Sequence, residues 1–390
     1  MNTLSFAKEL FSVALLFSCL TACSKDEATA DAPSIPGNTT DSLNNGSSAP
    51  TAYPQLINRT TAYPASYATE AERRGTVEEL TYSTRDYVNG NGTARTNNAY
   101  VYLPYGYTPE RKYNILYLVH GHYGDASTFL SVENGLLRNV LDHMIAQGDI
   151  DPMIVVTPTY NYGSPTANYV DAGPYCRALP EELHRDLIPL VESRYSTYAE
   201  TTDDEGIAAS RDHRAIGGFS MGGVTTWFAF DERLSDYRFF LPFSGDCWSL
   251  GSFQGQNNPS ATTNYLARCI MEQGYTPQDF YIWAAAGTSD SAYGEILSQV
   301  RGMAARSDVF PLSNLSFHEK AGARHEYAPM VEYLYNALPF LFPPSATTAV
   351  RNLSAKTSRE QTAYNIAGQK IAMSDTAHGL YIIDGKKINK

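Results

Sequence analysis

The sequence predicts an α/β protein in which a mostly parallel sheet is covered by helices on both faces. Nearly all-apolar runs are typical of strands buried on both faces, and they lie at residues 113–121, 153–160, 239–245 and 280–290. Segments with helical spacing alternate with these runs, at residues 131–148, 180–195, 221–232 and 293–306. This alternation indicates parallel pairing, because a parallel neighbour needs a long crossover, usually a helix.

Further elements extend the pattern at both ends. Two strand-like segments, residues 76–87 and 98–104, come before the first buried run. A strand at residues 315–322 and a final helix at residues 328–342 come after the last one. Gly148 marks the end of the first helix. Acidic residues in the first turn of the helix at 180–195 complement its dipole.

The first 65 residues are predicted to be a leader and a linker. Lys8 precedes an apolar run at residues 10–20, which is too short to span a membrane. The letters "LTAC" at 20–23 resemble a bacterial lipobox, so we expect residues 1–23 to be a lipoprotein signal peptide with lipidation at Cys23. The alternative is an ordinary cleaved signal peptide. Residues 24–65 are rich in small and polar residues and are expected to form a flexible linker.

The main domain is predicted at residues 66–343, and residues 344–390 are expected to form a small β-rich tail. The tail loosely resembles type IX secretion sorting tails. Together with Cys23, these features predict an outer-membrane or cell-surface lipoprotein, or a secreted protein. Beyond the leader the cysteines are Cys176, Cys247 and Cys269, an odd number that allows one disulfide but does not select the pair.

The chain of 390 residues is acidic, with a formal net charge of −12, and contains 28 Tyr. This balance argues against a nucleic-acid partner, because phosphate binding needs clustered Lys and Arg. Abundant Tyr suits a neutral ring-shaped ligand such as a sugar, although aromatic residues also serve in ordinary packing.

A Gly-x-Ser-x-Gly motif lies between the predicted strand at 213–219 and the helix that follows. Gly218, Ser220 and Gly222 fit the pattern of a nucleophile elbow, in which a sharp turn exposes the serine Oγ above the sheet. Ser220 is therefore the candidate nucleophile. The Met221 amide, the first after it, is the expected first donor of an oxyanion hole.

A serine nucleophile needs a histidine base after it in the chain. His325 follows the last core strand, where a catalytic loop is expected, and is the candidate base. The other histidines after Ser220 are His318, within a predicted strand and expected to be a packing residue, and His378, in the tail.

The base in turn needs an orienting acid. Asp290 ends the run "AAAGTSD" after the penultimate core strand and is the preferred candidate. Asp246, after "FFLPFSG", is the rival one strand earlier.

The second oxyanion donor is expected in the loop after "YLVHG", from the backbone of His122 or Tyr123. His120 and His122 also raise the alternative of a metal site. No third ligand accompanies them in the sequence, so we expect neither a metal nor another cofactor.

Several blocks of the chain resemble one known family. "YVYLPYGYTPERKYNILYLVHG", "GIAASRDHRAIGGFSMGGVTTW", "LPFSGDCW", "GTSDSAYGE" and "GARHEYAPMVEYLYNALPFLF" are similar to feruloyl esterases of carbohydrate esterase family 1, including esterase modules attached to bacterial xylanases. The resemblance covers about residues 66–343. It implies an α/β-hydrolase fold with Ser220, Asp290 and His325 as the triad. Family members often carry a Gly-rich run after "HG", where this chain has "HYGD".

The resemblance implies hydrolysis of ferulate esters on arabinoxylan, and hence a feruloylated cell-wall polysaccharide or oligosaccharide as partner. Alternatives are an acetylxylan esterase, an acyltransferase, or a surface lipoprotein that binds glycan without catalysis. An aromatic acyl group needs apolar walls. The candidate wall residues are Trp248, Tyr123, Tyr327, Tyr162, Tyr169 and Tyr175.

Overall fold

The computed structural model describes residues 53, 55–130, 135–162 and 166–342, together with the backbone of four short strands between residues 363 and 389. Between residues 57 and 320, nine strands form one sheet. They are β1 (Ile57–Arg59), β2 (Thr76–Arg85), β3 (Ala94–Leu103), β4 (Asn114–Val119), β5 (Met153–Pro158), β6 (Arg214–Phe219), β7 (Phe239–Phe243), β8 (Tyr281–Gly287) and β9 (Leu315–Lys320).

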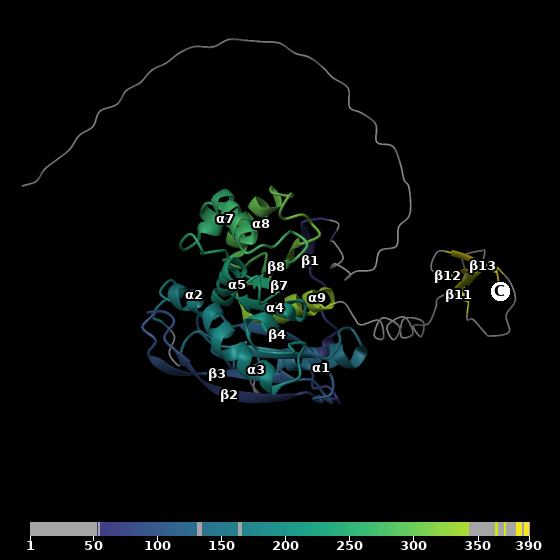
Figure 1. Cartoon of the computed structure of the whole chain (residues 1–390). Coiled ribbons are helices and arrows are strands. Elements are labelled where there is room, and N and C mark those ends of the chain that lie inside the picture. Colours follow the sequence, from purple (N-terminus) through teal and green to yellow (C-terminus); the bar gives the residue numbers. More distant parts are fainter. Residues whose placement is uncertain are drawn as a thin grey trace, which may run out of the picture. The chain divides into compact units, whose positions relative to one another are not determined.

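The sheet has the strand order β1-β9-β8-β7-β6-β4-β5-β3-β2 (Figure 1). All neighbours from β1 to β5 in this order are parallel. Strand β3 pairs antiparallel with both β5 and β2. The predicted mostly parallel sheet is confirmed, with an antiparallel edge formed by the first two predicted strands.

Helices cover both faces of this sheet. They are α1 (Leu136–Gln147), α2 (Gly173–Glu182), α3 (Ile188–Arg194), α4 (Asp204–Ala209), α5 (Met221–Glu232), α6 (Gln254–Asn257), α7 (Pro259–Glu272), α8 (Tyr293–Ala304) and α9 (Tyr327–Ala337). Shorter segments are η1 (Ala65–Ala68), η2 (Leu183–Leu187), η3 (Arg211–His213) and η4 (Leu338–Phe340). Helices α2, α3, α5, α7 and α8 pack on one face, and α1 and α9 on the other.

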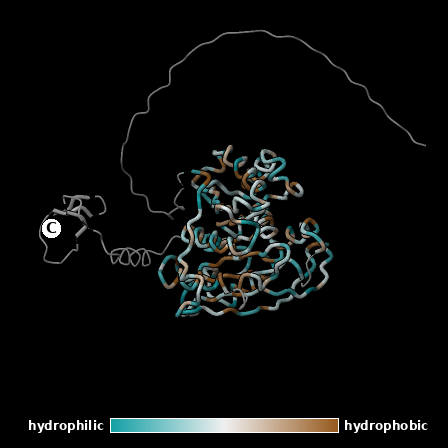
Figure 2. The backbone as a smooth tube through the Cα atoms, turned by 180° about the vertical axis from the view of Figure 1, so that it is seen from behind, coloured by the Kyte–Doolittle hydropathy of each residue, from teal (hydrophilic) through white to brown (hydrophobic). Residues whose placement is uncertain are grey.

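The central strand β4 shows why these strands are mostly apolar. Tyr117 and Val119 belong to the core on one face, and Leu116 and Leu118 to the core on the other. Successive side chains of a strand point to opposite faces, so a strand covered twice needs apolar residues at every position. In Figure 2 the apolar segments accordingly gather inside the body of this domain.

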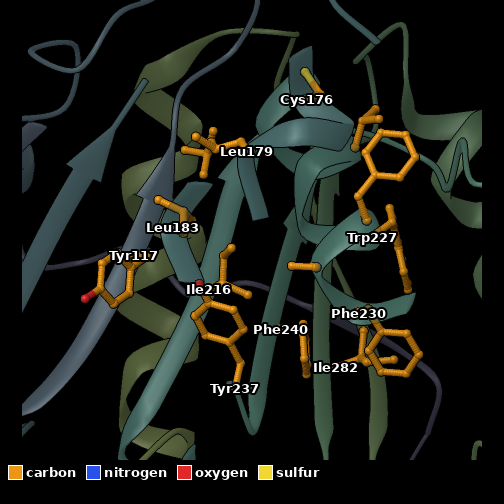
Figure 3. Packing of buried hydrophobic residues seen from close by; sticks show 14 of the residues in the cluster. Tyr117, Cys176, Leu179, Leu183, Ile216, Trp227, Phe230, Tyr237, Phe240 and Ile282 are labelled. Carbon is orange, nitrogen blue, oxygen red and sulfur yellow. The ribbon is translucent and has the colours of Figure 1, made fainter. Parts of the chain in front are cut away.

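Helix α5 lies at the centre of one face. Trp227 and Phe230 pack with Phe240 of β7 and Ile282 of β8 (Figure 3). The rings of Phe230 and Phe240 meet edge to face, with 4.9 Å between their centroids. Residues Met221 through Asp231 are all buried. The helix that begins beside Ser220 is therefore held by a rigid core along its length.

The folded domain begins before residue 66. Strand β1 lies within the predicted linker at 24–65, yet it pairs in parallel with β9 at the edge of the sheet. The Thr60 hydroxyl donates to Glu332 Oε1 at 2.6 Å and thereby ties this segment to α9. A strand of three residues at a sheet edge leaves little periodicity to detect.

Two helical regions also differ from the prediction. The helix expected at 180–195 begins at Gly173 and continues through α2, η2 and α3 to Arg194, with Pro180 inside it. A proline is common at the start of a helix, but here the buried side chains of Cys176 and Leu179 extend the helix ahead of it. Helices α6 and α7 come from a Ser-, Thr- and Asn-containing stretch for which no element was predicted.

The small β-rich tail was expected at residues 344–390. Four strands occur there, β10 (Ala363–Asn365), β11 (Lys370–Ile371), β12 (Leu380–Ile383) and β13 (Lys386–Asn389), paired antiparallel in the order β11-β10-β12-β13. The predicted signal peptide and Cys23 lie outside the described residues. Within the described residues, no helix has the length and apolarity needed to cross a membrane.

The three cysteines beyond the leader are free thiols. Cys176, Cys247 and Cys269 are each buried and none is bonded to another. Burial raises the pKa of Cys176 and of Cys247 to about 12. The disulfide that the odd cysteine count allowed is therefore not formed among these residues.

Candidate active site

Ser220 occupies a strained turn between β6 and α5. Its backbone has φ 57° and ψ −117°, a conformation that residues other than glycine rarely adopt. A Cβ atom on Gly218 would lie 2.5 Å from the backbone of Gly222, and one on Gly222 would lie 2.0 Å from the Val119 carbonyl oxygen. Both glycines of the motif are thus required by close backbone approach, as a nucleophile elbow demands.

Ser220, His325 and Asp290 form one hydrogen-bonded chain. Ser220 Oγ lies 2.9 Å from His325 Nε2, and His325 Nδ1 lies 2.7 Å from Asp290 Oδ1. A carboxylate only accepts, so Nδ1 carries the proton and Nε2 is left to accept the serine hydroxyl. The three residues come from the ends of β6, β8 and β9, where the parallel sheet brings them to one edge.

The Asp290 carboxylate is fixed by two further donors. Its Oδ2 accepts from the Ser244 hydroxyl at 2.8 Å, and its Oδ1 also accepts from the Ala292 amide at 2.7 Å. The side chain is fully buried behind His325. These bonds hold the carboxylate toward the imidazole.

The rival carboxylate, Asp246, faces different partners. Its Oδ1 accepts from Trp248 Nε1 at 2.7 Å, and its Oδ2 accepts from the Gln256 amide at 2.8 Å. Burial raises the pKa of Asp246 to about 6. Since both of its oxygens are engaged away from His325, the geometry selects Asp290 as the partner of the imidazole.

The amides expected to form an oxyanion hole lie beside Ser220. Met221 is the first residue of α5, so its N–H has no acceptor within the helix. Gly121, His122 and Tyr123 line the same pocket. The Gly121 amide already donates to the Tyr327 hydroxyl at 3.0 Å. Of the loop after β4, His122 is therefore a better second donor than Gly121.

His120 and Tyr327 support this loop. His120 Nδ1 donates to the Gly121 carbonyl oxygen at 2.7 Å, and Nε2 accepts from the Thr159 hydroxyl at 2.7 Å. Burial lowers the pKa of His120 to about 4, which keeps the ring neutral. Both ring nitrogens are occupied, and the described residues contain no group of three or more ligating side chains suited to a metal ion.

A pocket of about 350 Å³ opens in front of the triad. It is lined by seven of the predicted site residues, namely Ser220, His325, Met221, His122, Trp248, Tyr123 and Tyr327. Asp290 lies behind His325. Of the other predicted wall residues, only Tyr169 reaches this pocket. The Tyr162 hydroxyl instead bonds to Glu182 Oε2, and Tyr175 packs against the core.

Sequence reasoning missed several lining residues, among them Phe253 and Glu295. Phe253 precedes α6 and packs against Trp248 with 4.8 Å between ring centroids. It lies in the stretch without a predicted element, so no periodic signal pointed to it. Glu295 lies in the first turn of α8. An acidic residue is common there because it complements the helix dipole, so it does not by itself indicate a site.

The remaining histidine candidates lie elsewhere. His318 is buried in β9 and stacks on Trp283 with 3.9 Å between ring centroids, as expected for a packing residue. Burial lowers the pKa of His318 to about 3. His378 lies outside the described residues.

Comparison with known families agrees with this geometry. The model of the Esterase family matches residues 90–337. The chain belongs to this family. The solved structures that it resembles include a feruloyl esterase module, so the resemblance that its motifs predicted is confirmed.

Two relatives of this esterase are much longer proteins. The endo-1,4-beta-xylanase Y of Acetivibrio thermocellus is 39% identical over 284 residues, which cover 72% of this chain and 24% of that protein. An endo-1,4-beta-xylanase/feruloyl esterase of Xylanibacter ruminicola is 30% identical over 161 residues, which cover 39% of this chain and 19% of that protein. The chain thus spans a quarter or less of the length of these relatives.

Solved structures match the esterase more completely. A feruloyl esterase module from Clostridium thermocellum, complexed with sinapinate, is 37% identical with a TM-score of 0.64, covering 74% of this chain and 95% of that one. A CE1 ferulic acid esterase from Anaeromyces mucronatus is 20% identical with a TM-score of 0.54, covering 74% and 98%, and shows the shared fold. The predicted α/β-hydrolase fold is confirmed.

Proposed function

We propose that this esterase hydrolyses ferulate and related hydroxycinnamate esters on arabinoxylan, with Ser220, His325 and Asp290 as its catalytic triad. One observation carries the proposal. The hydrogen-bonded chain Ser220–His325–Asp290 opens onto an aromatic-lined pocket in a chain 37% identical to a feruloyl esterase module. The name of the Acetivibrio thermocellus relative, a xylanase, supports xylan as the polymer that carries the ester.

The reaction begins with attack of Ser220 Oγ on the ester carbonyl carbon. The hydroxyl proton passes to His325 Nε2, and Asp290 stabilises the imidazolium that forms. The amides of Met221 and His122 receive the oxyanion of the tetrahedral intermediate. Preorganised donors of this kind stabilise charge that appears only as the reaction proceeds.

The acyl-enzyme then forms and is hydrolysed. The intermediate collapses by breaking the bond to the sugar oxygen, which takes the proton from His325 Nε2 and leaves. A water next gives a proton to the same nitrogen and attacks the acyl carbonyl carbon. The second collapse returns the proton to Ser220 Oγ and releases the hydroxycinnamic acid. Water is the only co-reactant in this sequence.

The pocket favours an aromatic acyl group over acetyl, the main alternative. Trp248, Phe253 and Tyr169 form an aromatic wall, with 4.8 Å between the ring centroids of the first pair and 6.2 Å between those of the second. Tyr123 lies at the rim and is 86% exposed, where it is free to stack on a ring or a sugar. A volume of about 350 Å³ suits a phenyl ring on a short arm better than a methyl group.

The triad assignment is tested by Ser220→Ala and His325→Ala. Each should lower kcat for methyl ferulate by about 10⁴-fold or more, with a residual rate from the oxyanion hole. Steady-state assays on methyl ferulate, p-nitrophenyl acetate and acetylated xylan distinguish the alternatives. A wild type that cleaves acetylated xylan and ignores methyl ferulate would be an acetylxylan esterase. Undiminished turnover in folded Ser220→Ala would exclude the triad, and an inactive wild type would indicate a glycan-binding lipoprotein.

We further propose that the enzyme is anchored at the bacterial surface through lipid on Cys23. The lipobox-like "LTAC" and the polar stretch behind it support this location. Several acyl chains hold a protein firmly, whereas one binds only marginally. Cys23→Ser should move the protein from the membrane fraction to the soluble fraction, or leave it unprocessed. Unchanged fractionation of correctly processed Cys23→Ser would contradict the anchor.

A further inference from the structure

One carboxyl of the active-site pocket has no role in the triad. Glu295 lies in the first turn of α8, lines the pocket and is half-buried. In the part of the chain that the structure describes, its carboxyl forms no hydrogen bond and no ion pair. A carboxylate that is partly removed from water without a partner is costly, so such a group on a pocket wall calls for a ligand that donates to it.

The other polar groups near the Trp248 wall are already engaged. Trp248 Nε1 donates to Asp246, so the indole presents only its apolar surface to the pocket. The Ser244 hydroxyl donates to Asp290. Asp246 itself accepts from both Trp248 and the Gln256 amide. The Glu295 carboxyl is thus the unengaged acceptor beside this wall.

Most of the remaining polar side chains of the pocket belong to the triad and its supports or lie at the rim. Ser220 and His325 are bonded to each other, and the Tyr327 hydroxyl accepts from Gly121. Glu326 and Ser291 line the pocket but are exposed. The buried His122 ring also lines the pocket. Of the two carboxyl groups that line it, Glu295 and Glu326, only that of Glu295 is partly buried.

We propose that Glu295 is a specificity-determining residue, whose carboxylate accepts a hydrogen bond from the phenolic hydroxyl of a hydroxycinnamoyl ring. This inference rests on the proposed hydroxycinnamate substrate. The apolar body of the ring packs on the aromatic wall, and its one donor group meets Glu295. An acyl ring without that donor would leave the carboxylate unpaired, and sites of this kind reject such analogues strongly.

The electrostatics around Glu295 give the inference a second readout. Burial raises the pKa of Glu295 to about 7, and the negative charges of Asp246 and Asp290 add to this effect while His325 opposes it. Below this pH the group is mostly neutral and accepts weakly, and above it the carboxylate accepts strongly. Discrimination in favour of the phenol should therefore increase as pH rises through about 7.

The test compares two esters that differ only at the phenol. Methyl ferulate carries the hydroxyl, and methyl 3,4-dimethoxycinnamate carries a methoxy group in its place. For wild type, the ratio of kcat/KM for the first to that for the second should be about tenfold or more at pH 8 and smaller at pH 5.5. Taking the ratio cancels the titration of the triad, which both esters share.

The variants separate hydrogen bonding from general damage. Glu295→Leu should bring the ratio close to one at both pH values. Glu295→Gln, which keeps an acceptor oxygen, should retain part of the ratio and lose its pH dependence. Glu326→Gln removes a carboxyl from the pocket rim and is the matched control, with a ratio that should stay at the wild-type value.

The outcomes distinguish this inference from the proposed function. If wild type hydrolyses both esters equally well, or folded Glu295→Leu keeps the wild-type ratio, the role of Glu295 is excluded and the feruloyl esterase stands. If wild type hydrolyses neither ester yet cleaves p-nitrophenyl acetate, the acyl group of the proposed function is wrong, and the inference fails with it. Far-UV circular dichroism of each variant establishes that it is folded.

Discussion

The ends of β7 and β8 are two neighbouring regions with similar sequences of elements but different hydrogen-bond partners for their aspartates. Each strand is fully buried and each is followed within a few residues by a buried aspartate, Asp246 after β7 and Asp290 after β8. Asp290 bonds to His325 Nδ1 at 2.7 Å. Asp246 bonds instead to Trp248 Nε1 and the Gln256 amide.

The difference teaches that position after a strand does not decide the role of a carboxylate. Asp290 receives its orientation from Ser244 at the end of β7 and from its own loop, at Ala292. Asp246 instead accepts hydrogen bonds from Trp248 Nε1 and from the Gln256 amide in α6. Through the first of these bonds it holds Trp248 in the wall of the pocket. One strand end thus supplies the carboxylate that contacts His325, and the other supports that carboxylate and the wall of the pocket.

The largest expected effect is the contrast between Asp290→Asn and Asp246→Asn. An Asn at 290 offers its amide to Nδ1 and favours the wrong tautomer, so kcat should fall about 10³- to 10⁴-fold. Asp246→Asn should keep kcat for p-nitrophenyl acetate within about tenfold, because it leaves the triad intact. If folded Asp246→Asn were the more damaged variant, the assignment of the acid would have to be reversed.

A second prediction concerns stability and pH. The pKa of Asp246 is raised to about 6 in the folded state, mainly by burial. The unfolded chain holds this proton less tightly, so wild type loses stability as pH rises from about 4 through about 6. Asp246→Asn lacks this group, and its unfolding free energy relative to wild type should increase by about 2 kcal/mol between pH 4 and pH 8. Urea unfolding at both pH values measures the difference.

The control for this experiment is Asp212→Asn, a change at an exposed carboxylate on η3. Its stability difference from wild type should vary much less between the two pH values. Parallel curves for wild type and Asp246→Asn would show that the carboxyl of Asp246 titrates normally in the folded protein.

The smallest expected effect is at the contact between the two strand ends. Ser244→Ala removes one of the bonds to Asp290 and leaves the others in place. We expect a loss of a few-fold in kcat, corresponding to about 1 kcal/mol, the typical net contribution of one hydrogen bond, because the other bonds to Asp290 remain. Ser291→Ala, at an exposed serine on the pocket rim, is the control. Equal rates for both variants would mean that Ser244 does not orient the acid.

Much of the architecture and of the triad could be predicted from local patterns. Nearly continuous apolar runs identified β4, β5, β7 and β8, because a strand covered on both faces is mostly apolar. Gly-x-Ser-x-Gly between a strand and a helix identified Ser220, because only glycine tolerates the backbone approach at Gly218 and Gly222. His325 followed from chain order and from its place after the last strand, whereas the sequence preferred Asp290 as the acid and left Asp246 as a rival.

Tertiary structure decided the features that depend on contacts between segments far apart in the chain. The choice of Asp290 over Asp246 rests on hydrogen-bond directions at 2.7 to 2.8 Å, which spacing does not encode. Edge strand β1 exists because β9 is there to pair with it. Phe253 lies just before α6 and Glu295 lies in α8, and only the packing of these helices brings both residues to the pocket that contains Ser220. Local sequence patterns identified the candidate triad, and the packing determined which other groups share its pocket and which groups face one another.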